Sequence, residues 1–170
     1  EKTNFLIEDG LTGIVGPNGC GKSNIVESLR WVMGETSAKS MRGSGMEDVI
    51  FSGTSNKASK NIAEVSIEVE NKDKEGPIQY RETEQIQVRR KIEKDKGSKF
   101  YINDKEVRAR DAQMFFADLS TGAHSPSMIS QGRIGALVTA KPTDRRAILE
   151  EAAGISGLHV RRHEAELRLG

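Results

Sequence analysis

Eight consecutive residues near the start of the sequence carry a complete phosphate-binding pattern. Residues 16–23 read Gly-Pro-Asn-Gly-Cys-Gly-Lys-Ser and match G-x-x-x-x-G-K-[ST]. The glycines let the backbone curl so that successive N–H groups point at one anion. The Lys22 ammonium would reach the β- and γ-phosphates of a nucleotide, and the Ser23 hydroxyl would lie beside a Mg²⁺ ion. The pattern therefore predicts that the protein binds a nucleotide together with magnesium.

The residues on both sides of this loop fit the order of elements that the motif needs. Residues 11–15 form a short apolar run typical of a buried strand. Residues 22–33 place Ile25 and Leu29 at helical spacing, and Gly34 offers a stop. A helix beginning at the loop would add the partial positive charge of its N-terminus to the phosphate site. This context favours a phosphate loop over a chance match in a glycine-rich turn.

The composition excludes several classes of protein. The chain has 170 residues, 35% hydrophobic and 30% charged, which indicates one large polar domain or a domain with an extension. The given residues contain no apolar run of membrane-spanning length, and we expect no signal peptide among them. A single cysteine rules out an internal disulfide framework and fits a reducing cytosol. A net charge of +1 gives no nucleic-acid footprint. Because the sequence starts with Glu rather than Met, we expect it to be trimmed at this end.

Apolar periodicity predicts the remaining elements. The middle of the chain reads as an antiparallel meander, because apolar and polar residues alternate with a period of two. Strands are expected over residues 5–7, 11–15, 49–51, 63–70, 78–80, 85–92, 99–103 and 128–130. Helices are expected over residues 22–33, 111–119 with Asp111 as N-cap, 142–153 with Pro142 in the first turn, and from residue 156 onward.

Four motifs together resemble one protein family. Residues 16–35 closely resemble the N-terminal head segment of bacterial SMC chromosome-partition ATPases. The other motifs follow in family order over residues 37–53, 129–134 and 141–155, and the likeness is weakest across residues 71–104. The phosphate loop alone would identify only a superfamily, whereas the four motifs together are specific.

The resemblance implies a fold and a division of the chain. We expect an α/β P-loop NTPase fold, the N-terminal half of an ABC-type ATPase head. A mixed sheet would carry the phosphate loop at a strand end, flanked by an antiparallel β subdomain and by C-terminal helices leading to a coiled coil. Residues 1–155 would form the N-terminal lobe of the head, and residues 156–170 would begin the coiled-coil arm.

The resemblance also assigns roles to individual residues, with ATP and Mg²⁺ as cofactors. Lys22 and Gln131 are expected to be catalytic, and Ser23 and Gln131 to meet the Mg²⁺ ion. Arg42 resembles an arginine that reaches the nucleotide. The expected ATP-binding residues are Gly16, Pro17, Asn18, Gly19, Cys20, Gly21, Lys22, Ser23, Asn24 and Arg42.

The sequence has no Walker B strand with its catalytic carboxylate and no ABC signature stretch. In the SMC family both lie in a C-terminal segment that completes the head. We therefore expect this chain to bind ATP weakly and to hydrolyse it negligibly alone. The implied partners are that C-terminal half, a second head in an ATP-dependent homodimer, kleisin-type accessory subunits and DNA without sequence specificity, but no membrane.

The implied function is ATP hydrolysis that drives head engagement and DNA organisation in chromosome condensation and segregation, in the cytoplasm at the nucleoid. The alternative is a recombination or double-strand-break repair ATPase of the same superfamily. An ABC transporter domain, a small-molecule P-loop kinase and a nonhydrolytic scaffold are further readings. The kinase would need an arginine-bearing lid that the sequence does not show.

Several single features keep two interpretations. Cys20 is either a redox switch or a small residue that fits the loop. His159 and His163 could share a helix face as metal ligands, and His124 could be catalytic, but solvated surface histidines explain all three. A basic cluster could contact a DNA backbone or could be a solvated hairpin tip. The cluster consists of Arg89, Arg90, Lys91, Lys94, Lys96 and Lys99.

Overall fold

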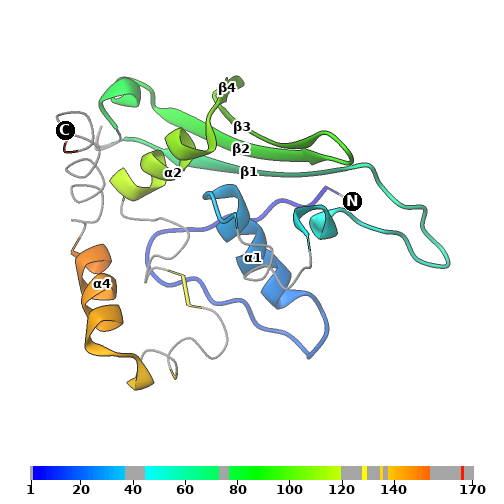
Figure 1. The fold of residues 1–170 in the computed structure, drawn as a ribbon, viewed down its shortest axis with the longest axis horizontal. Helices are drawn as coiled ribbons and strands as arrows, with labels where there is room; N and C mark the ends of the chain where they lie inside the picture. Colours follow the sequence, from blue (N-terminus) through cyan, green and yellow to red (C-terminus); the bar gives the residue numbers. More distant parts are fainter. Residues whose placement is uncertain are drawn as a thin grey trace.

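The computed structural model describes residues 2–36, 45–72, 77–119, 128–129, 135, 138–153 and 166 (Figure 1). Its sheet is an antiparallel meander of four strands in the order β1-β2-β3-β4. The strands are β1 (Ile62–Glu70), β2 (Gln85–Glu93), β3 (Gly97–Ile102) and β4 (Lys105–Val107). The meander predicted from the alternating pattern is thus confirmed, and β4 is an addition that the sequence did not reveal.

The turn from β3 to β4 explains that addition. Asn103 and Asp104 have φ values of 47° and 63°, so both lie in the left-handed region. Two left-handed residues between antiparallel strands give the two-residue hairpin turn whose twist matches the strands. The Asn103 side chain strengthens the turn, because its Oδ1 accepts the amide of Gln87 at 2.9 Å.

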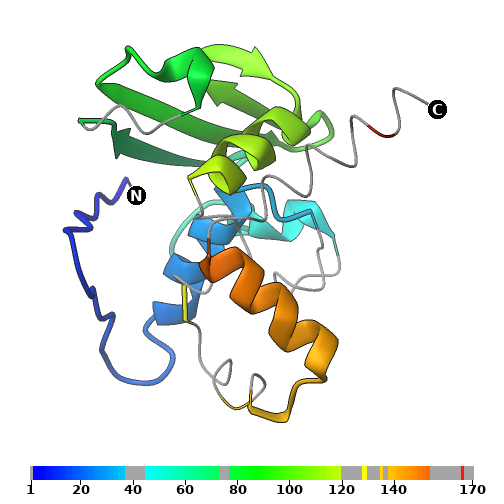
Figure 2. The same ribbon diagram turned by 90° about the vertical axis from the view of Figure 1, so that its left-hand side faces the viewer.

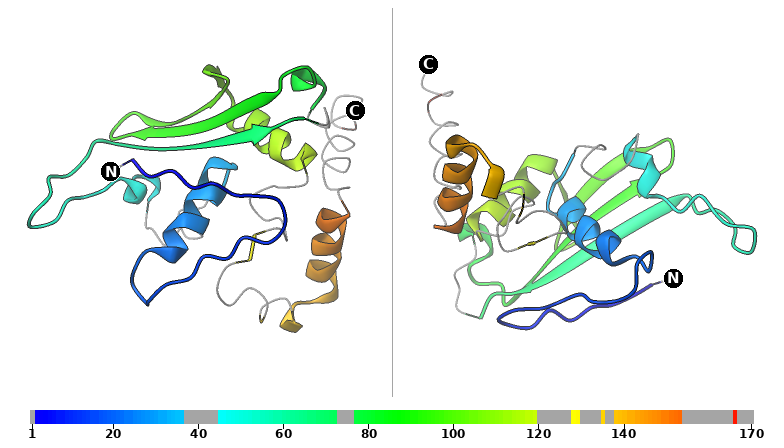
Figure 3. Two further views of the ribbon diagram at one scale, coloured as in Figure 1. Left: turned by 180° about the vertical axis from the view of Figure 1, so that it is seen from behind. Right: turned by 90° about the horizontal axis from the view of Figure 1, so that it is seen from below.

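Two helices cover one face of the sheet. Helix α1 (Lys22–Val32) and helix α2 (Ala109–Asp118) both lie on the face below the strands in Figures 1 and 2. Helix α4 (Pro142–Ala152) stands beyond the edge of the sheet in Figure 3. The main core is the layer between sheet and helices. Its buried residues are Val32, Ile86, Val88, Phe100, Ile102, Ala112, Phe115 and Phe116, and Trp31, Ile50 and Ile92 form a second cluster.

The helix predictions hold with one change at a boundary. Helices over 22–33 and 142–153 are confirmed as α1 and α4, and Pro142 is the first residue of α4. Helix α2 begins before the predicted residue 111, so Asp111 is not its N-cap. Asp111 lies in the first turn, where its carboxylate accepts the Arg108 amide at 3.2 Å. The arm predicted from residue 156 lies outside the described residues, except for Glu166 in helical conformation.

Two predicted strands in the middle of the chain are wrong. Residues 46–49 form the 3₁₀ helix η2 (Met46–Val49), with Ile50 buried behind it, and residues 78–80 form the 3₁₀ helix η3 (Ile78–Tyr80). In η2 the Asp48 carboxylate accepts the Gly45 amide at 3.0 Å, which favours a turn over an extended chain. Three apolar residues in a row are too few to reveal a period. Met128 and Ile129 form no strand, and Ser130 lies outside the described residues.

The N-terminal segment contains no strand, contrary to the prediction for residues 5–7 and 11–15. Figure 2 shows it passing outside the sheet and the helices. Its apolar side chains are exposed, with Leu6 at 81%, Leu11 at 97% and Val15 at 92%. A strand needs a partner for its backbone N–H and C=O groups, and the described residues supply none. The predicted mixed sheet therefore does not form within the described residues, whose strands are all antiparallel.

Gly34 ends α1 in a way that makes a testable prediction. Its φ is 106°, and a Cβ added there would lie 2.2 Å from Cγ of Gln113. The Gly34→Ala change should destabilise the fold by about 2 kcal/mol, from left-handed strain and a lost hydrogen bond. The measurement is urea unfolding followed by Trp31 fluorescence. Gly97, with φ 82° and open space around it, is the matched control. Gly97→Ala should cost only the strain, about 1 kcal/mol; equal losses would contradict the crowding.

Candidate nucleotide-binding site

The phosphate loop is placed at the start of α1. Gly19 and Gly21 have φ values of 82° and 90°, so the chain makes two left-handed steps before the helix begins at Lys22. Gly21 is the N-cap, and its carbonyl accepts the Asn24 amide at 3.0 Å. The N–H groups of a first helical turn have no carbonyl partner within the helix. These amides and the positive end of the helix dipole make the loop a site for an anion.

The Lys22 side chain folds back over the loop. Its Nζ donates to the carbonyl oxygens of Gly16 at 2.7 Å and Pro17 at 2.6 Å, and lies 3.9 Å from Sγ of Cys20. These contacts join the beginning of the loop to its end. A phosphate oxygen would give the ammonium a charged acceptor, which forms a stronger hydrogen bond than a neutral carbonyl. The lysine can therefore exchange the two carbonyls for phosphate without moving its backbone.

The donor set fits the phosphates of a nucleotide and a magnesium ion. The loop contributes backbone amides, Lys22 contributes the mobile charge, and the half-buried Ser23 places a hydroxyl in the first turn of α1. A Cβ at Gly16 would lie 3.0 Å from Sγ of Cys20, so a larger residue there would crowd the Cys20 side chain. A hydroxyl beside phosphate oxygens is a ligand set suited to Mg²⁺.

Two of the predicted nucleotide residues lie outside the part of the chain that the structure describes. Arg42 and Gln131 lie outside the described residues, as do His124, His159 and His163. Within the described part of the chain, no group of three or more His, Cys, Asp and Glu side chains could hold a metal ion. A Mg²⁺ ion at Ser23 would also need oxygen ligands from the nucleotide.

The residues of the basic cluster that could contact DNA lie in different environments in the structure. Arg90 is 3% exposed and lies inside the core. Arg89 is held between Glu64 and Asp104 at 3.2 and 2.9 Å. On the strand edge, Lys96 pairs with Glu93 at 2.7 Å and Lys99 with Glu106 at 2.9 Å, and the hydrogen bond to Glu106 raises the pKa of Lys99. Four of the six residues of the cluster are thus buried or paired with carboxylates, so these four do not form a continuous positive surface.

Sequence reasoning missed that Arg90 belongs to the core. Its position could have been found, because Ile86, Val88, Arg90 and Ile92 recur with a period of two along β2. A charged residue on the apolar face of a strand signals a buried polar contact. Burial lowers the pKa of Arg90 to about 10, while the nearby Glu35 carboxylate opposes this shift. The guanidinium therefore stays protonated at neutral pH.

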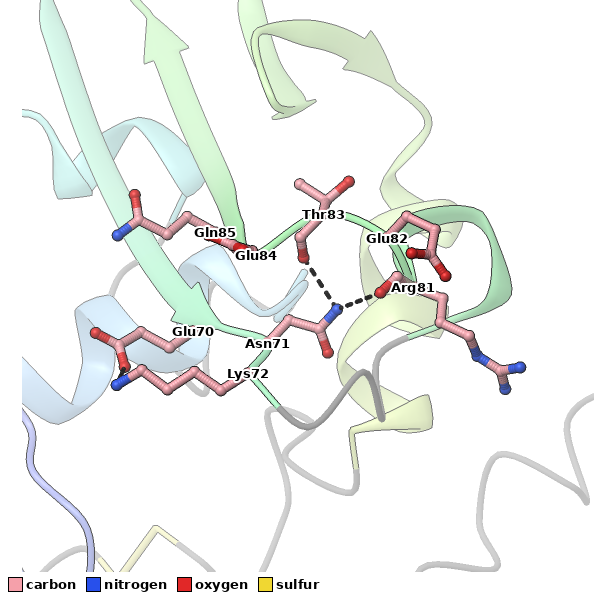
Figure 4. Close-up of a pocket in the computed structure, with 8 residues that line it drawn as sticks. All are labelled: Glu70, Asn71, Lys72, Arg81, Glu82, Thr83, Glu84 and Gln85. Atoms are coloured by element: carbon pink, nitrogen blue, oxygen red, sulfur yellow. Dashed lines mark hydrogen bonds and ion pairs between the residues drawn. The ribbon is translucent and has the colours of Figure 1, made fainter.

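A shallow pocket after β1 has a structural role. It is lined by residues 70–72 and 81–85, and the buried Asn71 lies at its centre (Figure 4). The Asn71 Nδ2 donates to the carbonyls of Tyr80, Arg81 and Thr83 at 3.1, 3.2 and 3.0 Å. The amide thus ties the connection between β1 and β2 together, and the pocket shares no residue with the phosphate loop.

Sequence comparison gives close relatives. Residues 1–133 match the profile of the RecF/RecN/SMC N-terminal domain family. The chain is 55% identical over 169 residues to the chromosome partition protein Smc of Rhodopseudomonas palustris, and 57% identical to that of Cereibacter sphaeroides. Both alignments cover 99% of this chain and 15% of the relative. The chain thus spans about one-seventh of the length of these proteins.

Structure comparison gives solved SMC heads. One, from work on ATP-driven dimerization and DNA-stimulated activation of SMC ATPases, has a TM-score of 0.72 and 30% identity over 86% of each chain. A Pyrococcus furiosus Smc head with an extended coiled coil, bound to the C-terminal domain of ScpA, has a TM-score of 0.72 and 28% identity, covering 90% of this chain and 38% of that one. These likenesses confirm the predicted P-loop NTPase fold of an SMC head. No helix in the described part of the chain has the length and apolar character needed to span a bilayer.

Cys20 offers a direct test of the loop. It is the only cysteine of the chain, and it is exposed. N-ethylmaleimide should therefore label the protein once, as measured by mass spectrometry. Mg-ATP at ten times its Kd should slow the labelling by about tenfold, because only the nucleotide-free fraction reacts. The Lys22→Ala variant should be labelled at the same rate with and without nucleotide. Labelling of the unsubstituted protein that ignores Mg-ATP would contradict the placement of the phosphates.

Proposed function

Because the chain belongs to the RecF/RecN/SMC N-terminal domain family and has the fold of an SMC ATPase head, we propose that it is the ATP-binding half of such a head. The observation that carries this proposal is the phosphate loop. Helix α1 begins at Lys22 directly after a left-handed glycine, and the Lys22 ammonium lies over the loop carbonyls at 2.7 and 2.6 Å. Backbone amides, a mobile cation and a hydroxyl thus occupy the same turn.

The loop residues would act by positioning and by charge. The Lys22 ammonium leaves Gly16 and Pro17 for the phosphates, and the loop amides hold the phosphate oxygens. Ser23 would hold a Mg²⁺ ion, which would supply positive charge beside the phosphates when it is bound. Gln131 would orient the attacking water and contact the metal, and Arg42 would reach the nucleotide. The other residues proposed to bind ATP lie in the loop and in the first turn of α1. They are Pro17, Asn18, Cys20 and Asn24.

The exposed N-terminal segment supports the need for a second half of the head. Leu6, Leu11 and Val15 are between 81% and 97% exposed along an extended chain. Apolar residues this exposed on an unpaired segment are typical of an interface. We propose that the C-terminal half of the same head covers this segment and supplies the Walker B carboxylate and the signature motif.

We propose that the complete head works in chromosome condensation and segregation. ATP would join two such heads, and hydrolysis would separate them and change how the coiled-coil arms hold DNA. Kleisin-type subunits are proposed partners, since related heads were solved with domains of ScpA. The relatives described above are chromosome partition proteins, which favours this function over double-strand-break repair. The protein would act in the cytoplasm at the nucleoid, binding DNA without sequence specificity.

Turnover in the completed head tests the assigned lysine. This chain alone should hydrolyse ATP negligibly, and co-expression with its C-terminal half should restore turnover. Lys22→Ala should then lower kcat/KM by at least about 100-fold, because a charge contact to the transferred phosphoryl group is lost. Gln131→Ala should lower kcat in the same assay. Ser28→Ala is the control on α1, because the Ser28 hydroxyl donates to the Ile25 carbonyl of its own helix at 2.7 Å. Unchanged turnover by Lys22→Ala would contradict the proposed role of the phosphate loop.

Association of the two halves tests the apolar segment. Leu11→Asp places a charge where Leu11 is 97% exposed, so the fold of the chain itself should not suffer. Co-purification with the C-terminal half should nevertheless be lost, because an unpaired charge would be buried in the interface. Ile78 is 78% exposed on η3, and Ile78→Asp is the matched control that should still co-purify. Retention of the partner by Leu11→Asp would show that this segment is not the interface.

A further inference from the structure

Side chains from two other elements donate hydrogen bonds to the C-terminal end of α1 and to the residues just after it. Arg90 on β2 donates from Nη1 to the carbonyls of Trp31 at 2.7 Å and Glu35 at 2.6 Å. Gln113 on α2 donates from Nε2 to the carbonyl of Gly34 at 2.7 Å. The last carbonyls of a helix lack partners within it. Here the Trp31 carbonyl in the last turn of α1, and the Gly34 and Glu35 carbonyls just after the helix, are bound by residues that lie more than fifty positions away in the sequence.

Arg90 is itself fixed on all sides. Its guanidinium carbon lies 4.5 Å from the ring centroids of both Trp31 and Phe100, and its Nε donates to Ser98 Oγ at 2.8 Å. Only 3% of its surface is exposed. Burying a charge is costly, and an apolar side chain of similar volume often gives a fold that is equally stable or more stable. Stability alone therefore explains this arginine poorly, whereas the geometry it imposes on α1 explains it directly.

Both ends of α1 then serve one site. A cation at the C-terminal end and phosphates at the N-terminal end both match the helix dipole. The helix has 11 residues, which separates its ends by about 16 Å. A helix this short is stiff, so a rotation or slide at its last turn moves Lys22 and Ser23 as well. Hydrogen bonds from two separate elements, β2 and α2, join this end of the helix to the rest of the fold and so oppose both movements.

We propose that Arg90 and Gln113 are positioning residues for the nucleotide. They hold the C-terminal end of α1 against the sheet and α2, so that the first turn presents Lys22 and Ser23 to the phosphates in a fixed place. This inference rests on the proposed function of the loop. The antiparallel sheet thereby becomes part of the nucleotide site without touching the nucleotide.

The test uses the full-length protein and four variants. Arg90→Met keeps length and apolar contact but removes every donor, and Arg90→Lys keeps the charge and an N–H donor but loses the planar guanidinium. Gln113→Met removes the second donor. Ile102→Val is the control, since it trims the same core on β3 without removing a hydrogen bond. Thermal unfolding of all four is measured first, so that the variants are compared at similar losses of stability.

Two readouts then separate positioning from stability. Without nucleotide, the amides of Gly34 and Glu35 are bonded to the carbonyls of Trp31 and Arg30. Their hydrogen exchange should become about tenfold faster in Arg90→Met, with a smaller increase in Gln113→Met. The Kd for ATP should rise by about tenfold in Arg90→Met, and Arg90→Lys should restore part of the affinity. Ile102→Val should leave both quantities within about twofold of the unsubstituted protein.

The outcomes are distinct. An unchanged Kd in Arg90→Met, or an equal rise in Ile102→Val, would overturn the positioning role. If Arg90→Met does not fold, Arg90→Lys and Gln113→Met decide by the same criteria. Lys22→Ala is titrated in parallel: if it binds ATP normally, the proposed function of the loop fails. If Lys22→Ala no longer binds ATP while Arg90→Met and Gln113→Met bind it normally, only the positioning role of Arg90 and Gln113 fails.

Discussion

The packing of α1 against the antiparallel sheet is the contact on which the rest of the molecule depends. Trp31 and Val32, at 2% and 0% exposure, bury the last turn of the helix in the two core clusters. Burial of an apolar side chain of this kind contributes about 1.5–3 kcal/mol. The phosphate loop, at the other end of the helix, is mostly exposed and has no comparable anchor. The core therefore determines where the loop lies.

Buried hydrogen bonds add a directional constraint to the apolar packing of α1. Apolar side chains resist separation, but they resist sliding poorly because the hydrophobic effect has no direction. Hydrogen bonds from Arg90 and Gln113 to the carbonyls of residues 31, 34 and 35 do have direction. The sheet face thus contains one charged residue among apolar ones, at the point where the helix needs a fixed orientation.

The outer face of the sheet and the N-terminal segment differ in the kind of side chain that they expose. The outer face of the sheet pairs its charges, with Arg89 between Glu64 and Asp104 and Lys99 beside Glu106. Such exposed pairs contribute little stability, but they neutralise Arg89 and Lys99, two members of the basic cluster that could contact DNA. The N-terminal segment instead exposes Leu11 and Val15. The N-terminal segment therefore lacks an apolar partner within the described residues.

The sequence by itself determined the elements whose signals are local. The loop motif, the period of α1 and the alternation along β1 and β2 depend on neighbouring residues, and the structure agrees with each. Only the tertiary structure decided where distant partners were needed. Residues 11–15 have the composition of a strand, yet they stay unpaired because no strand of the described residues lies beside them. Arg90 read as part of a surface cluster, yet it is buried, because the carbonyls it binds belong to a helix far away in the sequence. Local propensity can be read from neighbouring residues, whereas the partner of a backbone group or of a buried charge is chosen only when the chain folds.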